Sequence, residues 1–162
     1  MKTLVFTAIN LADTDRLGTA LAAALPGGTV MVLSGTLGAG KTRLVQAIAA
    51  ACGIDRETVV SPTFVLCQQY EGSRAICHFD VYRLKDQDEF WQLGPEEYFD
   101  GPGLSIIEWG EKVTACLPRE RLEIQIEPLG EESREFKLAA TGAALEAALA
   151  IIARQLSHGR GP

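Results

Sequence analysis

Residues 35–42 read Gly-Thr-Leu-Gly-Ala-Gly-Lys-Thr and match the pattern Gly-x-x-x-x-Gly-Lys-Ser/Thr at every specified position. The motif follows the continuous apolar run 29–33 and precedes a segment in which Leu44 and Ile48 mark one helical face. A buried strand, a glycine-rich turn and a helix in this order are typical of a phosphate-binding loop, the P-loop. The stretch therefore predicts an α/β fold built around a P-loop.

Each specified residue type of this loop has a chemical reason. Phosphate oxygens need several backbone N–H donors that converge on one spot, and Gly35, Gly38 and Gly40 permit that approach. Lys41 supplies a positive charge for the β- and γ-phosphates, and Thr42 supplies a hydroxyl for Mg²⁺. A tight turn that merely needs glycine would explain neither of these two residues. We therefore expect a nucleoside triphosphate and Mg²⁺ as cofactors.

The hydrophobic pattern outside the loop predicts a three-layer P-loop NTPase-like fold, with a mixed sheet flanked by helices. An amphipathic helix, capped by Asp13 or Thr14, precedes the first buried strand and ends at Pro26. Two apolar runs around Glu71-Gly72-Ser73 indicate an antiparallel hairpin. We expect further strands at 4–9, 104–107, 122–126 and 136–138, short helices after Asp86 and over 111–116, and a C-terminal helix over 143–156.

The chain has 162 residues, of which 47% are hydrophobic and 22% are charged. A domain typically has about 100–200 residues, and this composition is that of an ordinary globular protein rather than a disordered or collagen-like one. No internal repeat and no long linker divides the chain. We therefore expect a single P-loop ATPase domain over 1–156 and a disordered tail over 157–162.

The charge balance restricts the partners. There are 15 Lys and Arg against 21 Asp and Glu, which gives a net charge of −6. A chain this acidic lacks the positive surface with which a protein grips nucleic acid phosphates unaided. If the protein acts on nucleic acid, we expect contact with it only indirectly, through a protein partner.

Localisation and thiol chemistry follow from two negative observations. The longest apolar stretch, Ala147–Ala153, is far shorter than the roughly 18 residues of a membrane-spanning helix, and residues 1–13 lack the apolar core and cleavage site of a secretory signal. The four cysteines form no Cys-x-x-Cys pair. We therefore expect a cytoplasmic protein without a membrane partner, whose thiols are reduced and mostly buried.

The P-loop by itself names neither the base nor the reaction. Asn10 is the single asparagine of the chain, so the Asn-Lys-x-Asp signature that reads guanine is absent and ATP is favoured. The Leu-Ser-Gly-Gly-Gln signature of transporters is absent too. Small kinases of this class carry an arginine-rich lid, whereas the arginines here are scattered. A kinase is therefore less favoured than a hydrolase, but it stays open.

Two acidic residues end apolar strands, where a P-loop protein needs a carboxylate near Mg²⁺. Glu108 closes the uniformly apolar run 104–107, and we favour it for the metal. Asp80 alternates onto the same strand face as His78 and suits a carboxylate that orients water or senses the γ-phosphate. The alternative for Asp80 is an acid that pairs with Arg83 or is solvated.

Three weaker candidates surround these acids. Ser61 and Thr63 flank a proline about twenty residues after the lysine, where a γ-phosphate-sensing switch could lie, although an ordinary Ser-Pro turn explains them nearly as well. His78 is better explained as a polar residue packed in a strand than as a catalytic base. Trp109 could stack on a base or on a partner, or simply pack at the rim.

Taken together, four motifs resemble the bacterial TsaE (YjeE) family over nearly the whole chain. They are the P-loop at 35–42, Ser-Pro-Thr-Phe at 61–64, His-Phe-Asp-Val-Tyr-Arg-Leu at 78–84 and Ile-Glu-Trp at 107–109. The resemblance implies a small ATPase that is needed to form threonylcarbamoyladenosine in transfer RNA. It also implies a partner, the complex of the transferase subunit TsaD with its paralogue TsaB.

Carried over residue by residue, the resemblance makes Thr42 and Glu108 ligands of Mg²⁺ and Asp80 essential for hydrolysis or coupling. Ser61 and Thr63 fall in its switch-like loop. Departures are Thr36, where the family commonly has an acid, and Arg43, where it commonly has a second threonine; both lie outside the specified positions. Lys41 and Asp80 are thus the expected catalytic residues, and the expected nucleotide contacts are Gly35, Leu37, Gly38, Ala39, Gly40, Lys41, Thr42 and Trp109, with looser matches at Thr14 and at Ser133-Arg134.

The sequence thus predicts a Mg²⁺-dependent ATPase, slow by itself and stimulated by TsaD–TsaB, in which positioning and charge stabilisation carry the catalysis. Two rivals stay open: a small-molecule kinase, and a nucleotide-gated scaffold that never hydrolyses ATP.

Overall fold

The computed structural model describes residues 1–158, which form seven strands and seven helices. The strands are β1 (Lys2–Ala8), β2 (Thr29–Ser34), β3 (Cys67–Tyr70), β4 (Ile76–Asp80), β5 (Leu104–Glu108), β6 (Leu122–Pro128) and β7 (Arg134–Ala140). The α-helices are α1 (Leu11–Ala24), α2 (Lys41–Ala51), α3 (Gln87–Trp91), α4 (Pro95–Phe99) and α5 (Ala143–His158), and the 3₁₀-helices are η1 (Arg56–Thr58) and η2 (Gly110–Cys116).

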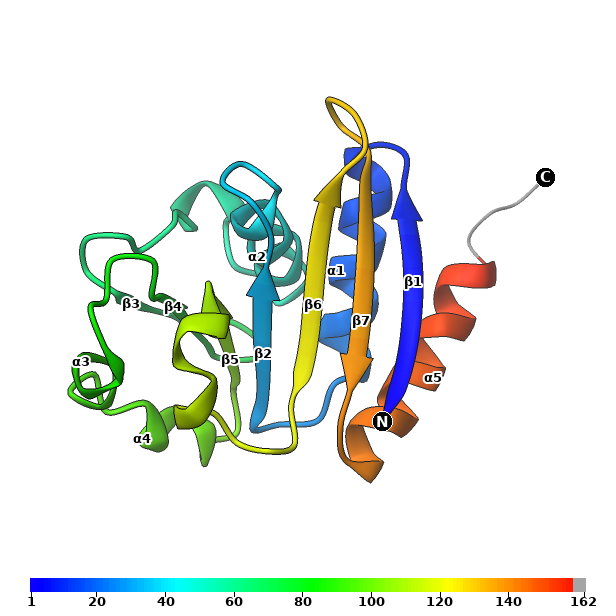
Figure 1. Ribbon diagram of the computed structural model, residues 1–162. Coiled ribbons are helices and arrows are strands. Elements are labelled where there is room, and N and C mark those ends of the chain that lie inside the picture. Colours follow the sequence, from blue (N-terminus) through cyan, green and yellow to red (C-terminus); the bar gives the residue numbers. More distant parts are fainter. Residues whose placement is uncertain (159–162) are drawn as a thin grey trace.

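All strands join one mixed sheet in the order β1-β7-β6-β2-β5-β4-β3 (Figure 1). The central strands β6, β2, β5 and β4 run parallel, whereas β3, β7 and β1 pair antiparallel with their neighbours. Because β2 lies in the middle and is buried along nearly its whole length, its apolar run carries no alternation. The predicted mixed α/β sheet and the β3–β4 hairpin are confirmed.

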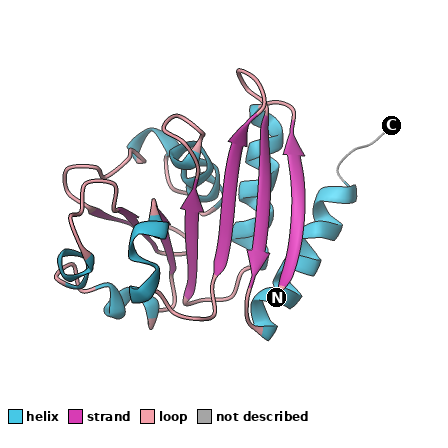
Figure 2. Ribbon diagram, viewed as in Figure 1, coloured by secondary structure: helices cyan, strands magenta, loops and turns pink. Residues whose placement is uncertain are grey.

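Two apolar clusters cover the two faces of the sheet. Met31 and Ile106 belong to the larger cluster, beneath α1, α2 and α5. Val30 and Ile107, their neighbours in sequence, point to the opposite face and join a cluster that includes Phe90 of α3. Figure 2 shows that this second helical layer does not extend over β6, β7 and β1, so the third layer is partial.

The parallel strands bring the functional residues to one edge. β2, β5 and β4 all end at the same side of the sheet, where Leu33 pairs with Glu108 and Glu108 pairs with Asp80. The P-loop follows β2 directly. The carboxyl edge of a parallel sheet is where open α/β folds bind ligands.

Some expected boundaries are corrected. Asn10, rather than Asp13 or Thr14, caps α1, because its side chain accepts a hydrogen bond from the backbone N–H of Asp13. The helix expected over 111–116 is a 3₁₀-helix with non-helical backbone at Val113. α5 continues through His158, two residues into the expected tail, and residues 159–162 of that tail lie outside the described part.

Within residues 1–158, every helix is too short or too polar to cross a membrane. Among the described cysteines, Cys52, Cys77 and Cys116 are buried free thiols and Cys67 is partly exposed, as expected.

Candidate functional site

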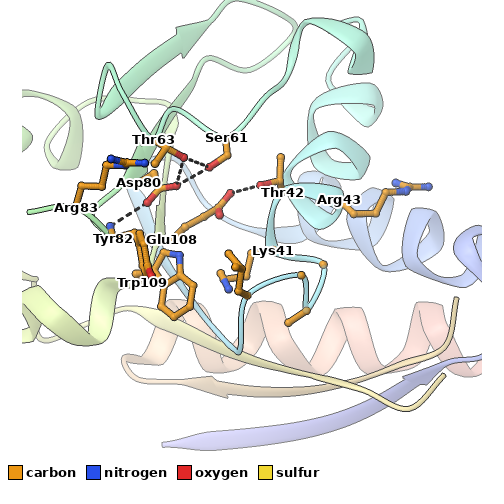
Figure 3. Close-up of a pocket in the computed structure, with 14 residues that line it drawn as sticks. Lys41, Thr42, Arg43, Ser61, Thr63, Asp80, Tyr82, Arg83, Glu108 and Trp109 are labelled. Carbon is orange, nitrogen blue, oxygen red and sulfur yellow. Dashed lines mark hydrogen bonds between the residues drawn. The ribbon is translucent and has the colours of Figure 1, made fainter. Parts of the chain in front are cut away.

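A pocket of about 460 Å³ opens where β2, β4 and β5 end (Figure 3). P-loop residues Leu37–Thr42 form one side, and Asp80 and Glu108, the last residues of β4 and β5, form the other. Ser61, Thr63 and Trp109 complete the predicted part of the lining. The fold thus gathers residues spread over more than seventy positions of the chain into one cavity.

The backbone of the P-loop needs glycine at two positions. Gly35 has φ +148°, and a Cβ there would lie 2.6 Å from the carbonyl oxygen of Ile126. Gly40, the residue before α2, has φ +109°, a conformation that L side chains rarely adopt. Because glycine adopts these backbone conformations and allows the close approach at Gly35, the loop can pass tightly from strand to helix and present the N-terminus of α2 to the pocket.

Lys41 reaches back over the loop. Its Nζ donates to the carbonyl oxygens of Gly35 (2.7 Å) and Thr36 (3.0 Å) and lies 3.8 Å from the ring centroid of Trp109. Desolvation lowers the pKa of Lys41, and the charges of Glu108, Glu111 and Asp80 oppose that shift. A desolvated ammonium whose nearest partners are backbone carbonyls is suited to receive an anion.

Thr42 and Glu108 meet at the floor of the site. The hydroxyl of Thr42 donates to Oε1 of Glu108 over 2.8 Å, and Nε2 of His78 lies 2.8 Å from the same oxygen. The Glu108 and His78 side chains are almost completely buried. The strand-end acid that the sequence singled out therefore lies against the P-loop hydroxyl.

Asp80 is fixed by the segment predicted to be switch-like. Oδ2 of Asp80 accepts hydrogen bonds from the hydroxyls of Ser61 (2.5 Å) and Thr63 (3.1 Å), and Oδ1 accepts from the backbone N–H of Tyr82 (2.9 Å) (Figure 3). The carboxylate is therefore neither paired with Arg83 nor freely solvated, the two structural alternatives raised by the sequence. Any movement of residues 61–63 would alter the surroundings of Asp80.

Trp109 forms the rim of the pocket opposite the loop. Its backbone is left-handed (φ +62°), and its N–H donates to the carbonyl oxygen of Leu33, the residue that pairs with Glu108. Its indole packs against the ring of Tyr82, with centroids 4.9 Å apart. The strained turn places the aromatic face over the Lys41 ammonium.

The remaining predicted residues lie elsewhere. Gly35 begins the P-loop, and its carbonyl oxygen accepts a hydrogen bond from Lys41. Thr14 is buried in α1. Gly35, Thr14 and Ser133 do not line the pocket. Arg43, Tyr82 and Arg83 also line the pocket, although the sequence indicated no site role for them; Tyr82 and Arg83 lie within the quoted 78–84 motif and Arg43 directly follows the P-loop motif. Arg134, a loose match only, supports the loop through the Ala39 carbonyl.

The residues at the floor fit Mg²⁺ bound together with a nucleotide. Residues 1–158 contain no cluster of three or more His, Cys, Asp or Glu that would hold a metal by itself. Mg²⁺ in nucleotide sites takes only one or two protein oxygens and fills its other positions with phosphate and water. One hydroxyl and one carboxylate in contact, beside a P-loop, are a donor set of this kind.

Comparisons with known proteins agree with this arrangement. The family model described as Threonylcarbamoyl adenosine biosynthesis protein TsaE matches residues 9–136. A tRNA threonylcarbamoyladenosine biosynthesis protein TsaE from Treponema pallidum (strain Nichols) is 41% identical over 127 residues, covering 78% of this chain and 93% of the relative. The protein of the same name from Bacillus subtilis (strain 168) is 39% identical over 143 residues, covering 88% and 89%.

A solved structure is similar over nearly its whole length. The crystal structure of Bacillus subtilis YdiB superposes with a TM-score of 0.79 at 32% sequence identity and covers 94% of this chain and 95% of that one. At this identity and coverage, the fold of this chain is that of the solved relative.

Proposed function

This chain belongs to the TsaE family of threonylcarbamoyl adenosine biosynthesis proteins, and on that premise we propose that it is a Mg²⁺-dependent ATPase that acts on a TsaD–TsaB-like complex. Its role lies in tRNA threonylcarbamoyladenosine biosynthesis. In this proposal it works in the cytoplasm and meets transfer RNA only through its partner, in keeping with its net charge of −6.

One observation carries the proposal: the Thr42 hydroxyl and the Glu108 carboxylate are in contact beside a P-loop. A glycine-rich loop alone can bind phosphate in many proteins. A loop threonine held against the acid at the end of the neighbouring strand is the donor pair that P-loop ATPases use for the cation. Thr42 and Glu108 would hold Mg²⁺, and the bound ion would neutralise part of the phosphate charge.

The chemistry assigned to the chain's own residues is binding and positioning. The P-loop backbone and Lys41 bind the phosphates, and the Lys41 ammonium exchanges its carbonyl partners for phosphate oxygens. Asp80 orients the attacking water, since its carboxylate lines the pocket and its direction is set by Ser61 and Thr63. Phosphoryl transfer needs little else, because positioning and electrostatics dominate it.

The surroundings of the pocket support a protein partner. Leu37 of the loop and Phe64 beside the Ser61–Thr63 segment are 81% and 84% exposed. Leu37 lines the pocket and Phe64 directly follows its lining residue Thr63, so these exposed apolar side chains support a partner surface beside the pocket. Because Phe64 follows the residues that hold Asp80, a partner bound there would sense the state of the nucleotide.

The test is phosphate release from Mg·ATP and Mg·GTP by the pure protein, with and without TsaD–TsaB. Lys41→Ala is the blank, and Lys137→Ala, which removes an exposed lysine of β7, is the matched control. We expect slow, ATP-selective release that rises with the partner, vanishes in Lys41→Ala and persists in Lys137→Ala.

Other results would contradict parts of the proposal. Equal release by wild type and Lys41→Ala would show that the site is assigned wrongly. ATP binding without release under any condition would favour the nucleotide-gated scaffold, and transfer of labelled γ-phosphate to an acceptor other than water would favour the kinase.

A further inference from the structure

His78 of β4 is a completely buried imidazole that the proposed chemistry does not use. It lies on the strand face of Asp80, two residues before it, and β4 pairs with β5 so that His78 is opposite Ile106 and Asp80 is opposite Glu108. His78 therefore faces Glu108 diagonally across the strand pair, at a distance that a ring nitrogen can span.

The direction of the hydrogen bond between the two side chains follows from the role proposed for Glu108. A carboxylate that binds Mg²⁺ is ionised and can only accept, so in the 2.8 Å contact between Nε2 of His78 and Oε1 of Glu108 the hydrogen belongs to Nε2. The other ring nitrogen, Nδ1, is buried and has no hydrogen-bond partner among the described residues. The ring thus directs one N–H donor at a single carboxylate oxygen.

That oxygen receives a second donor from a different element. The Thr42 hydroxyl, at the start of α2, also bonds to Oε1 of Glu108 at 2.8 Å. The other oxygen, Oε2, accepts no hydrogen bond from residues 1–158, although Glu108 lines the pocket. The two oxygens of the Glu108 carboxylate therefore differ: Oε1 accepts from a residue of α2 and is bonded to a residue of β4, and Oε2 is left for another ligand.

The terminal torsion of a glutamate is otherwise poorly determined. It has a broad, roughly two-fold preference, so a carboxylate held by one donor can turn and exchange its oxygens at small cost. Two donors on the one oxygen Oε1, from Thr42 and His78, remove that freedom. A cation site gains affinity when the groups behind its ligands fix their orientation.

We propose that His78 is the positioning residue of the metal-binding carboxylate: its Nε2–H holds Glu108 so that Oε1 faces Thr42 and Oε2 stays available to Mg²⁺. This inference rests on the proposed function, because it assumes that Glu108 serves the cation. It gives the histidine of the 78–84 motif a role other than that of a general base or of packing alone.

The experiment measures the binding of a fluorescent ATP analogue to the full chain, first in EDTA and then with increasing Mg²⁺. The variants are His78→Leu, which keeps a buried apolar volume without a donor, and His78→Gln, whose amide N–H₂ can take the place of Nε2. We expect His78→Leu to need about tenfold more Mg²⁺ for half-maximal binding, with unchanged affinity in EDTA. His78→Gln should restore the wild-type requirement to within about threefold.

The alternatives are separable. An unchanged Mg²⁺ requirement in His78→Leu overturns the inference, and so does an equal loss of affinity in EDTA and in Mg²⁺, which would indicate a purely structural role. If His78→Leu does not fold by circular dichroism, His78→Asn replaces it, because its shorter amide cannot reach Glu108 and should need more Mg²⁺ than His78→Gln. Wild type that binds ATP identically with and without Mg²⁺ would overturn the proposed metal site itself, and this inference with it.

Discussion

Nε of Arg134 donates a hydrogen bond to the carbonyl oxygen of Ala39 over 2.7 Å, so the first residue of β7 holds the P-loop from 95 positions away. The same guanidinium also bonds to the carbonyl oxygens of Gly130 (2.7 Å) and Ser133 (2.8 Å) in the β6–β7 turn. The shape of the phosphate-binding loop is therefore set partly from outside the strand–loop–helix unit.

Replacing this arginine should weaken nucleotide binding. We expect Arg134→Ala to raise the Kd for Mg·ATP about tenfold, since charge-assisted hydrogen bonds contribute about 1.5–3 kcal/mol and part of that organises the loop. Titration calorimetry measures the change. Arg154→Ala, which removes an exposed arginine of α5, is the control and should bind ATP like wild type. Identical affinities in both variants would mean that the loop holds its shape without Arg134.

The hydroxyls of Ser61 and Thr63, which donate to Asp80, should affect the rate of ATP hydrolysis rather than the affinity for ATP. We expect the double variant Ser61→Ala, Thr63→Ala to lower phosphate release about tenfold or more with TsaD–TsaB present, at unchanged Kd for ATP. The reason is that Oδ2 of Asp80 loses both of its side-chain donors. Thr63→Ser keeps its hydroxyl and should stay near the wild-type rate. A parallel loss of ATP affinity would place Ser61 and Thr63 in binding instead.

We expect the exposed aromatic ring of Phe64 to contact the protein partner. It is 84% exposed, and the Arg83 guanidinium lies 4.7 Å from its ring centroid. We expect Phe64→Ala to weaken TsaD–TsaB binding about tenfold or more, as for a buried interface aromatic, while ATP affinity and Tm stay unchanged. Val5→Ala, at an exposed apolar residue of β1, is the matched control for the pull-down. Equal capture of both variants would remove Phe64 from the interface.

Gly18 should tolerate no side chain, although it lies in a helix. A Cβ there would lie 2.5 Å from Cβ and 2.7 Å from the carbonyl carbon of Ala47 in α2. Alanine normally gains about 1 kcal/mol over glycine in a helix, but overpacking of this kind costs about 1–3 kcal/mol. We expect Gly18→Ala to reduce the free energy of unfolding in urea, and Thr19→Ala, on the exposed face, to leave it unchanged or higher. A more stable Gly18→Ala would show that α1 and α2 separate easily.

The cysteines should differ in their reactivity with pH. A hydrogen bond from Cys77, 3.1 Å away, lowers the pKa of the partly exposed Cys67 thiol, whereas burial raises the pKa of Cys52 and Cys116. Since the thiolate is the reactive form, Cys67 should be alkylated first by iodoacetamide, and still at a pH below the usual thiol pKa.

Removing the donor tests the cause of this difference. Cys77→Ala should raise the pKa of Cys67 and move its alkylation profile to higher pH, because the thiolate loses its hydrogen bond. Peptide mass mapping over a pH series identifies each site. An unmoved profile would contradict the hydrogen bond as the cause.

Short-range patterns account for what was predictable. The spacing of the glycines and Lys41 around a buried strand identified the P-loop, and apolar runs ending in Glu108 and Asp80 identified both acids as strand ends. The N-cap of α1 was wrong because Asn10, Asp13 and Thr14 are all good caps, and only the path of the backbone after β1 selects one of them.

The P-loop, the order of strands and helices and the family could all be predicted from the sequence, because they depend on residues that are neighbours along the chain. Which of these residues touch follows from the folded arrangement alone. The contacts of Thr42 with Glu108, of Ser61 with Asp80, of His78 with Glu108 and of Arg134 with Ala39 depend on the order and register of strands far apart in the sequence. Register is fixed by the packing of both faces of the sheet at once, which no local pattern encodes.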